Sequence, residues 1–263
     1  MNHFKNYHIS IDGLEIRYYA GGKGDPLVII HGGNSHARNW IQNAKELCKY
    51  YRVFIPDLPG FGLSQSIPGD YNFQTMVDFI DKFTTTVGLN KFNLAGHSVG
   101  GAIATNYVLY HSAKVKKLIL INSMGLGDEI ALWVRLLSRP TLCKTLGNGV
   151  LQVVNSIKWI AEGMFRSMDF IIPFSQTSLM IGCALVNLEK QTIVLKDRLS
   201  EIRVPTLVIW GKNDKIVPVK HAYAAAENIP DCRVKILAGG HCAYSRYPAE
   251  FSSSVIGFLN GNY

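Results

Sequence analysis

The sequence contains few cysteines, and their spacing suggests neither a metal site nor a disulfide framework. There are five, an odd number, with no C-x-x-C pair among them: Cys48, Cys143, Cys183, Cys232 and Cys242. The first ten residues, MNHFKNYHIS, lack the apolar segment of a secretory signal peptide. These absences predict a cytoplasmic protein with reduced thiols and no bound metal.

Long apolar runs are also scarce. One uncharged stretch, FIIPFSQTSLMIGCALVNL at residues 170–188, is about long enough to cross a bilayer. Pro173 near its start and the polar run at 175–178 argue against a membrane span. A buried or lid-forming pair of helices is the favoured interpretation.

Charged residues make up only 17% of the 263 residues, against 48% hydrophobic ones, which excludes a disordered chain and allows a large core. The net charge of +8 comes from basic residues that are dispersed along the sequence. Their densest cluster is Lys114, Lys116 and Lys117, too small to indicate nucleic-acid binding. We therefore expect a small-molecule substrate as the partner and a monomer or homodimer.

What the sequence does contain is an alternation of strand and helix patterns. Strands are predicted at 8–13, 14–20, 26–33, 51–57, 91–96, 115–123, 204–211 and 232–238. Helices are predicted at 38–49, 73–87, 99–111, 219–228 and 248–260. The first two strands form a hairpin at Asp12-Gly13, and the later apolar runs suit parallel strands covered on both faces. The pattern predicts an α/β doubly wound fold.

Residues 124–199 break this alternation. They are rich in Leu, Trp, Met and Phe at helical spacing and contain no convincing parallel strand. We interpret them as a helical cap, or lid, inserted into a core formed by residues 1–123 and 200–263. An insertion after a central strand would cover the ligand crevice of such a sheet.

The segment GHSVG, residues 96–100, matches G-x-S-x-G at the boundary between an apolar strand and a helix. The flanking glycines allow a sharp turn with Ser98, the candidate nucleophile, at its tip. A helix-capping serine is the alternative. The adjacent His97 belongs to the strand, so its ring is expected to point away from the Ser98 hydroxyl.

The base and the acid are predicted far along the chain. His241 follows the last strand in the glycine loop AGGH, and Asp214 follows the strand VPTLVIW in WGKNDKIVP. The order Ser98, Asp214, His241 is that of nucleophile-elbow hydrolases. An ordinary loop histidine and a turn-forming aspartate are the alternatives.

HGGN at residues 31–34 follows the strand PLVII and suits backbone N–H groups that face a ligand. We expect the N–H groups of Gly33 and Val99 to form an oxyanion hole. A merely flexible turn is the alternative.

Together, HGGN, PDLPGFGLS (56–64), GHSVGG, WGKNDKIVP and GGH resemble the α/β-hydrolase superfamily over residues 24–122 and 203–259. The resemblance implies an α/β-hydrolase fold with a mostly parallel eight-stranded sheet flanked by helices. It also implies a helical cap inserted after strand 6. PDLPGFGLS corresponds to the loop after strand 4, with a structural role.

The elbow serine favours a serine hydrolase that cleaves a carboxylic ester of a small to medium apolar substrate through an acyl-enzyme, without cofactor or metal. Carbon–carbon bond hydrolases of vinylogous diketones are an alternative, although they usually carry Asn-Ser-Met at the elbow and Trp after the catalytic histidine. Here the corresponding residues are His97, Val99 and Cys242. A slow-turnover small-molecule sensor is the remaining alternative.

Overall fold

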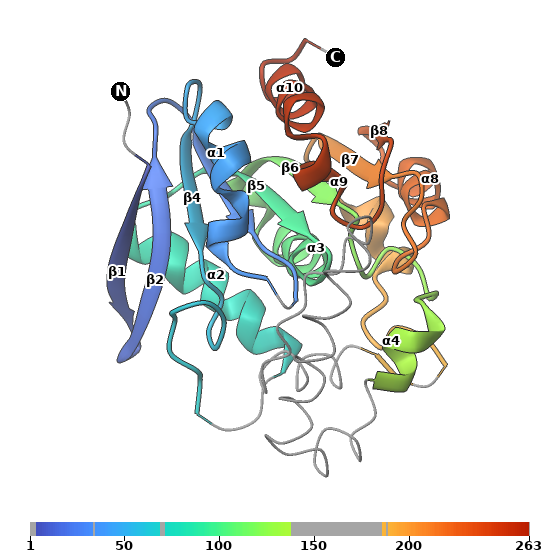
Figure 1. Ribbon diagram of the computed structural model, residues 1–263, viewed down its shortest axis with the longest axis horizontal. Helices are drawn as coiled ribbons and strands as arrows, with labels where there is room; N and C mark the ends of the chain where they lie inside the picture. The colour runs from blue at the N-terminus through green and yellow to red at the C-terminus, as the bar shows by residue number, and fades with distance from the viewer. Residues whose placement is uncertain (1–3, 34, 69–71, 138–185, 188, 263) are drawn as a thin grey trace, which may run out of the picture.

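The computed structural model describes residues 4–33, 35–68, 72–137, 186–187 and 189–262. An eight-stranded sheet forms its centre, in the order β1-β2-β4-β3-β5-β6-β7-β8 (Figure 1). The strands are β1 (Lys5–Ile11), β2 (Leu14–Gly21), β3 (Pro26–Ile30), β4 (Arg52–Pro56), β5 (Phe92–His97), β6 (Val115–Ile121), β7 (Thr206–Gly211) and β8 (Cys232–Leu237). The β1–β2 and β2–β4 pairs are antiparallel and all the others are parallel, which confirms the predicted hairpin and the mostly parallel sheet.

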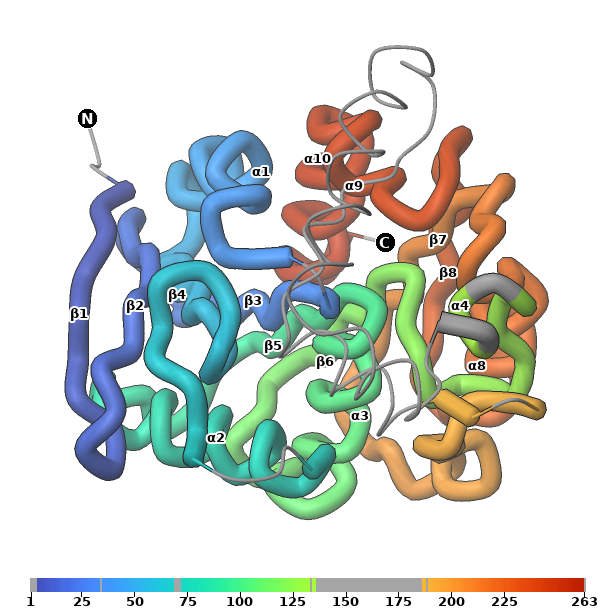
Figure 2. The backbone as a smooth tube through the Cα atoms, turned by 60° about the horizontal axis from the view of Figure 1, so that its bottom comes forward, coloured from blue at the N-terminus to red at the C-terminus, as the bar shows by residue number. Residues whose placement is uncertain are grey.

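Helices cover both faces of this sheet (Figures 1 and 2). One face carries α1 (Ile41–Leu47), α9 (Ala243–Arg246) and α10 (Pro248–Leu259), and the other carries α2 (Phe73–Thr86), α3 (Val99–His111) and α8 (Lys220–Asn228). Alternate residues of a strand point to opposite faces. In β7, Leu207 accordingly packs in the cluster of α10, and Val208 in that of α8.

Several element boundaries differ from the predicted ones because local turns end the strands early. β6 stops at Ile121 because Asn122 adopts a φ of 43°, and β3 stops at Ile30 before the glycines. The predicted helix 38–49 begins as the 3-10 turn η1 (Ala37–Trp40). The four-residue helix α9 was not predicted, whereas the hairpin turn is confirmed, with positive φ at both Asp12 and Gly13.

The described parts of the predicted cap are its two ends. They include α4 (Leu132–Leu137) and the 3-10 helix η3 (Lys196–Glu201), while residues 138–185 and 188 lie outside the described residues. The two ends are joined by Gln191, whose side chain accepts from Gly125 N at 2.8 Å and donates to Glu129 O at 2.9 Å. In the described part of the chain, the helices are too short or too polar to cross a membrane.

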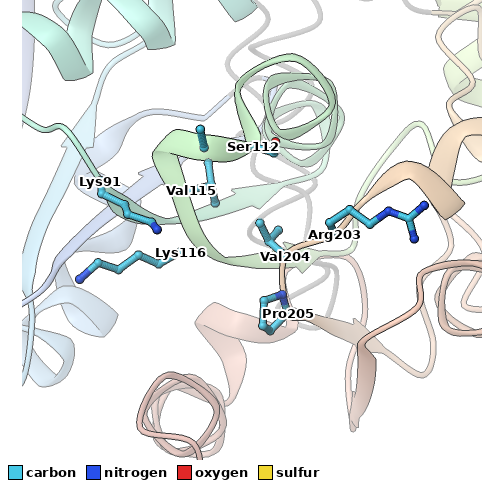
Figure 3. A pocket seen from close by; sticks show the side chains of 8 residues that line it. Lys91, Ser112, Val115, Lys116, Arg203, Val204 and Pro205 are labelled. Carbon is cyan, nitrogen blue, oxygen red and sulfur yellow. The ribbon is translucent and has the colours of Figure 1, made fainter.

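A shallow hollow of about 550 Å³ lies at the amino ends of β5, β6 and β7 (Figure 3). It is lined by Lys91, Ser112, Ala113, Val115, Lys116, Arg203, Val204 and Pro205. The helices α2 and α3 end at this edge, and the partial negative charge of a helix C-terminus favours nearby cations. Two lysines near this edge are paired with carboxylates: Lys114, in the η2 turn (Ser112–Lys114), with Asp81 at 2.6 Å, and Lys116 with Asp25 at 2.8 Å.

The loop after β4 is fixed by a buried ion pair. The guanidinium of Arg17, in β2, contacts Asp57 Oδ2 through Nη2 at 2.5 Å and through Nε at 2.6 Å. The same carboxylate accepts from the backbone N–H groups of Ala37, at 2.7 Å, and Leu63, at 3.0 Å. Asp57 thus connects β2 to both loops that follow β3 and β4.

Removing the charge of Asp57 should destabilise the protein strongly, because Arg17 would remain buried without a counter-charge. We expect Asp57→Asn to lower the free energy of unfolding by about 3–5 kcal/mol, measured by urea denaturation. The exposed Glu46–Lys49 pair provides the control, and Glu46→Gln should change stability by less than about 1 kcal/mol. An Asp57→Asn protein as stable as the Glu46→Gln protein would contradict the assignment.

Candidate active site

Ser98 occupies the sharp turn between β5 and α3. Its φ of 53° and ψ of −118° lie outside the regions that L-residues ordinarily adopt. The turn is possible because its neighbours lack side chains: a Cβ at Gly96 would lie 2.2 Å from Gly100 O, and one at Gly100 would lie 2.5 Å from His31 O. Ser98 is therefore held on a strained turn at the carboxyl edge of the sheet.

The carboxylate of Asp214 lies just beyond β7 and is fully buried. Its Oδ1 accepts from the backbone N–H groups of Ile216, at 2.8 Å, and Val217, at 3.1 Å. Burial alone would raise the pKa of this carboxyl, but the charge and hydrogen bond of His241, with the bonds from Asn122 and Ile216, lower it below the usual value. The group is therefore an oriented, ionised carboxylate.

His241 lies in the loop after β8 and faces this carboxylate. Its Nδ1 is 2.8 Å from Asp214 Oδ2, and because an ionised carboxylate only accepts, Nδ1 carries the proton. Nε2 is thereby left as the atom that can accept a proton from a hydroxyl. In the described residues no hydrogen bond joins Nε2 to Ser98, a bond that is often long in free hydrolases.

His97 packs against the His241 loop and bonds to its backbone. Its Nε2 donates to the backbone carbonyl of His241 at 2.9 Å, and the two ring centroids are 4.9 Å apart. Burial and the nearby charge of His241 lower the pKa of His97 to about 3, so the ring is neutral at ordinary pH. The structure thus brings His241, rather than His97, to the carboxylate.

An aromatic cluster beneath the same loop was not found from the sequence. The rings of Trp40 and Tyr244 stack with centroids 4.0 Å apart, and Asn43 Nδ2 donates to Tyr244 O at 2.9 Å. These contacts join η1 and α1 to α9, which begins two residues after His241. A short helix whose partners lie 200 residues away leaves no periodic signal in the sequence.

The glycine loop after β3 lies against the start of α3. A Cβ at Gly33 would be 3.3 Å from Val99 Cγ2, so the two expected oxyanion residues are neighbours. His31 holds this loop: its Nε2 accepts from Leu58 N at 3.0 Å, so Nδ1 is the atom that donates to Gly32 O at 2.8 Å. Burial, the largest effect on this ring, lowers the pKa of His31 to about 4, which keeps it neutral.

Asn122 is a further polar residue that the sequence analysis did not single out. It follows β6, is fully buried, and its Nδ2 donates to Asp214 Oδ2 at 2.6 Å. Only its place at the end of a strand hinted at a role, because the contact depends on how β6 and β7 pair. Within the described ranges, no group of three or more His, Cys, Asp or Glu residues could hold a metal ion.

This geometry can be compared with known proteins. Residues 25–167 match the family model of the alpha/beta hydrolase fold. The chain is 28% identical to 2-hydroxy-6-oxo-6-(2'-aminophenyl)hexa-2,4-dienoic acid hydrolase of Metapseudomonas resinovorans, with 96% of this chain and 90% of that protein covered. It is also 28% identical to monoacylglycerol lipase abhd6-A of Xenopus laevis, with 89% and 75% covered.

Solved structures show the same fold. A thermophilic esterase from Thermogutta terrifontis superposes with a TM-score of 0.77 at 24% identity, covering 98% of this chain and 99% of that one. The esterase from Exiguobacterium antarcticum superposes with a TM-score of 0.76 at 23% identity, covering 96% and 98%. At this identity the likeness concerns the fold alone, whereas the family model spans more than half of the sequence. The chain belongs to the α/β-hydrolase family.

Proposed function

We propose that the protein is a serine hydrolase that cleaves a carboxylic ester of a small to medium apolar substrate through an acyl-enzyme. The observation that carries this proposal is the 2.8 Å contact between His241 Nδ1 and the buried carboxylate of Asp214, beside the strained turn of Ser98. A base in a fixed tautomer close to a serine hydroxyl is the arrangement that activates a serine nucleophile.

The proposed first step is attack of Ser98 Oγ on the ester carbonyl. His241 Nε2 takes the hydroxyl proton, and Asp214 stabilises the resulting imidazolium. The backbone N–H groups of Gly33 and Val99 stabilise the negative charge on the carbonyl oxygen. Removal of one such donor typically costs about 2.7–4 kcal/mol of transition-state stabilisation.

Collapse of this intermediate expels the alcohol, which receives its proton from His241. A water molecule, deprotonated by His241, then attacks the acyl-enzyme and releases the acid and free Ser98. The segment 124–199 leaves the core directly beside this site, because Met124 N donates to Ser98 O at 3.0 Å. We propose that it forms the cap that shields the reaction from solvent.

Carbon–carbon hydrolysis of a vinylogous diketone is the second candidate. It is supported by the 28% identity to a dienoic acid hydrolase over 96% of this chain. The identity to the Xenopus monoacylglycerol lipase is the same, so the relatives do not separate the two reactions. Comparing kcat/KM for p-nitrophenyl esters and for a vinylogous diketone decides between them, since the true substrate class should be turned over far faster.

Replacing Ser98 should abolish covalent chemistry while leaving the fold intact. We expect Ser98→Ala to lose ester hydrolysis by a factor of at least about 10³ and to lose labelling by a fluorophosphonate probe. In the wild type, mass spectrometry should locate the probe on Ser98. A Ser98→Ala protein that retains wild-type hydrolysis would rule out Ser98 as the nucleophile.

The two neighbouring histidines should respond differently to substitution. His241→Ala removes the proposed base and should reduce kcat by a factor of at least about 10³. His97→Gln keeps a donor near the position of Nε2, so it should retain much of the activity, and His97→Asn should retain somewhat less. Equal losses in His241→Ala and His97→Gln, measured under saturating ester, would contradict these roles.

A further inference from the structure

Asn122 lies against both the proposed acid and the loop of the proposed base. Its Nδ2 donates at 2.6 Å to Asp214 Oδ2, the same oxygen that accepts from His241 Nδ1 at 2.8 Å. A longer contact of 3.5 Å joins Nδ2 to the carbonyl of Gly240. One amide group therefore touches the carboxylate and the backbone next to the base.

The orientation of this amide follows from its partner. Asp214 Oδ2 can only accept, so the nitrogen of Asn122 must face it and the oxygen must point the other way. Asn122 Oδ1 is buried and has no hydrogen-bond partner among the described residues. A buried amide with one unsatisfied atom is costly, which indicates that the bond made by Nδ2 is the reason for its presence.

The backbone of Asn122 is also strained. Its φ of 43° lies in the left-handed region, which asparagine tolerates better than most residues. The position is fixed because Asn122 N donates to Ile209 O at 2.9 Å, which continues the pairing of β6 with β7 beyond the end of β6. Strain of this kind persists where the surroundings determine the conformation and often accompanies function.

We propose that Asn122 is a positioning residue that acts through Asp214 on His241. By occupying Oδ2, the amide shares the negative charge of the carboxylate and limits how strongly it attracts the imidazolium of His241. It also fixes the orientation of the Asp214 carboxylate, because it holds Oδ2 while the N–H groups of Ile216 and Val217 hold Oδ1. This role rests on the triad proposed above.

The titratable groups around this amide come from three elements. Asp214 follows β7, His241 follows β8, and His97 lies in β5 with its Nε2 bonded to the carbonyl of His241. His97 is neutral at ordinary pH, because burial and the charge of His241 lower its pKa to about 3. A change at Asn122 should therefore be felt by the Asp214–His241 pair rather than by His97.

The variant Asn122→Gly tests this role, because glycine tolerates a positive φ while the amide is lost. Without the shared donor, Oδ2 attracts the His241 imidazolium more strongly. The acidic limb of the kcat/KM profile for a p-nitrophenyl ester should then move up by about half a pH unit or more. The plateau kcat should fall roughly tenfold, and KM should change much less.

The isosteric variant Asn122→Asp tests whether position 122 must donate a hydrogen bond or only fill space. Repulsion between two carboxylates this close opposes ionisation of the second, so the pair shares a proton at low pH and the carboxyl at position 122 can still donate. As the pH rises this proton is lost, and activity should fall over a range in which the wild type is constant. Wild-type activity of Asn122→Asp at every pH would overturn the proposal.

A matched control is available near the amino end of β5, at the other end of the strands from the site. Asn93 is also buried, and its Nδ2 donates to Pro26 O at 3.3 Å, far from the triad. Asn93→Ala should lower the melting temperature without moving the pH profile. If it moves the acidic limb as much as Asn122→Gly does, the effect is general destabilisation and the proposal fails.

A measurement without substrate keeps this test independent of the proposed reaction. In protein labelled with ¹⁵N-histidine, the low-field Nδ1–H resonance of His241 should shift in Asn122→Gly and stay unchanged in Asn93→Ala. An unchanged resonance in Asn122→Gly would overturn the role of Asn122, even if ester hydrolysis is confirmed. Conversely, the shift would support it even if the wild type hydrolyses no ester.

Discussion

The parallel register of β5, β6 and β7 is the constraint on which the site depends. His97 pairs with Ile121, and Ile121 pairs with Ile209, so β5 and β6 end in line while β7 continues for two more residues, to Gly211. Ladder-like bonds continue past these ends, from Ser98 N to Ile121 O at 3.0 Å and from Asn122 N to Ile209 O at 2.9 Å. Ser98 and Asn122 therefore follow the sheet side by side, and Asp214, three residues beyond β7, accepts from Asn122 Nδ2 at 2.6 Å. A slip of one residue in either pairing would turn these side chains to the opposite face.

Three buried histidines lie in this region, and the partner of each ring decides whether burial alone sets its charge. His31 and His97 bond to backbone groups that carry no full charge, so burial dominates and keeps both rings neutral. Neutral rings can hold the glycine loop and the His241 loop without repelling a nearby cation. His241 instead faces the carboxylate of Asp214, which would stabilise a positive ring as it forms. The site thus combines two neutral histidines that bond to backbone groups with a third that faces a carboxylate.

The sequence allowed the sheet and the candidate residues Ser98, Asp214 and His241 to be predicted, because each follows a strand whose apolar pattern is strong. Gly33 and Val99 followed from the same motifs, and their catalytic roles, like those of the other three, remain proposals. Asn122 was missed because its partner is 92 residues away and depends on strand pairing. The stacked pair of Trp40 and Tyr244 was missed for the same reason, since side-chain contacts between distant elements have no local periodicity.

The relatives include a dienoic acid hydrolase and a monoacylglycerol lipase, and the two reactions have a similar first step. Ester cleavage and carbon–carbon cleavage each require a carbonyl carbon to accept a nucleophile and an oxyanion to be stabilised. They differ in the leaving group, an alkoxide oxygen in one and a carbon in the other, and therefore in where the proposed base, His241, would deliver its proton. That choice depends on how the substrate is oriented above Ser98. In the described chain, the carboxyl edge of the sheet holds the groups proposed to react, and these are the same for both reactions. The same core is therefore compatible with either reaction, and the substrate comparison proposed above separates them.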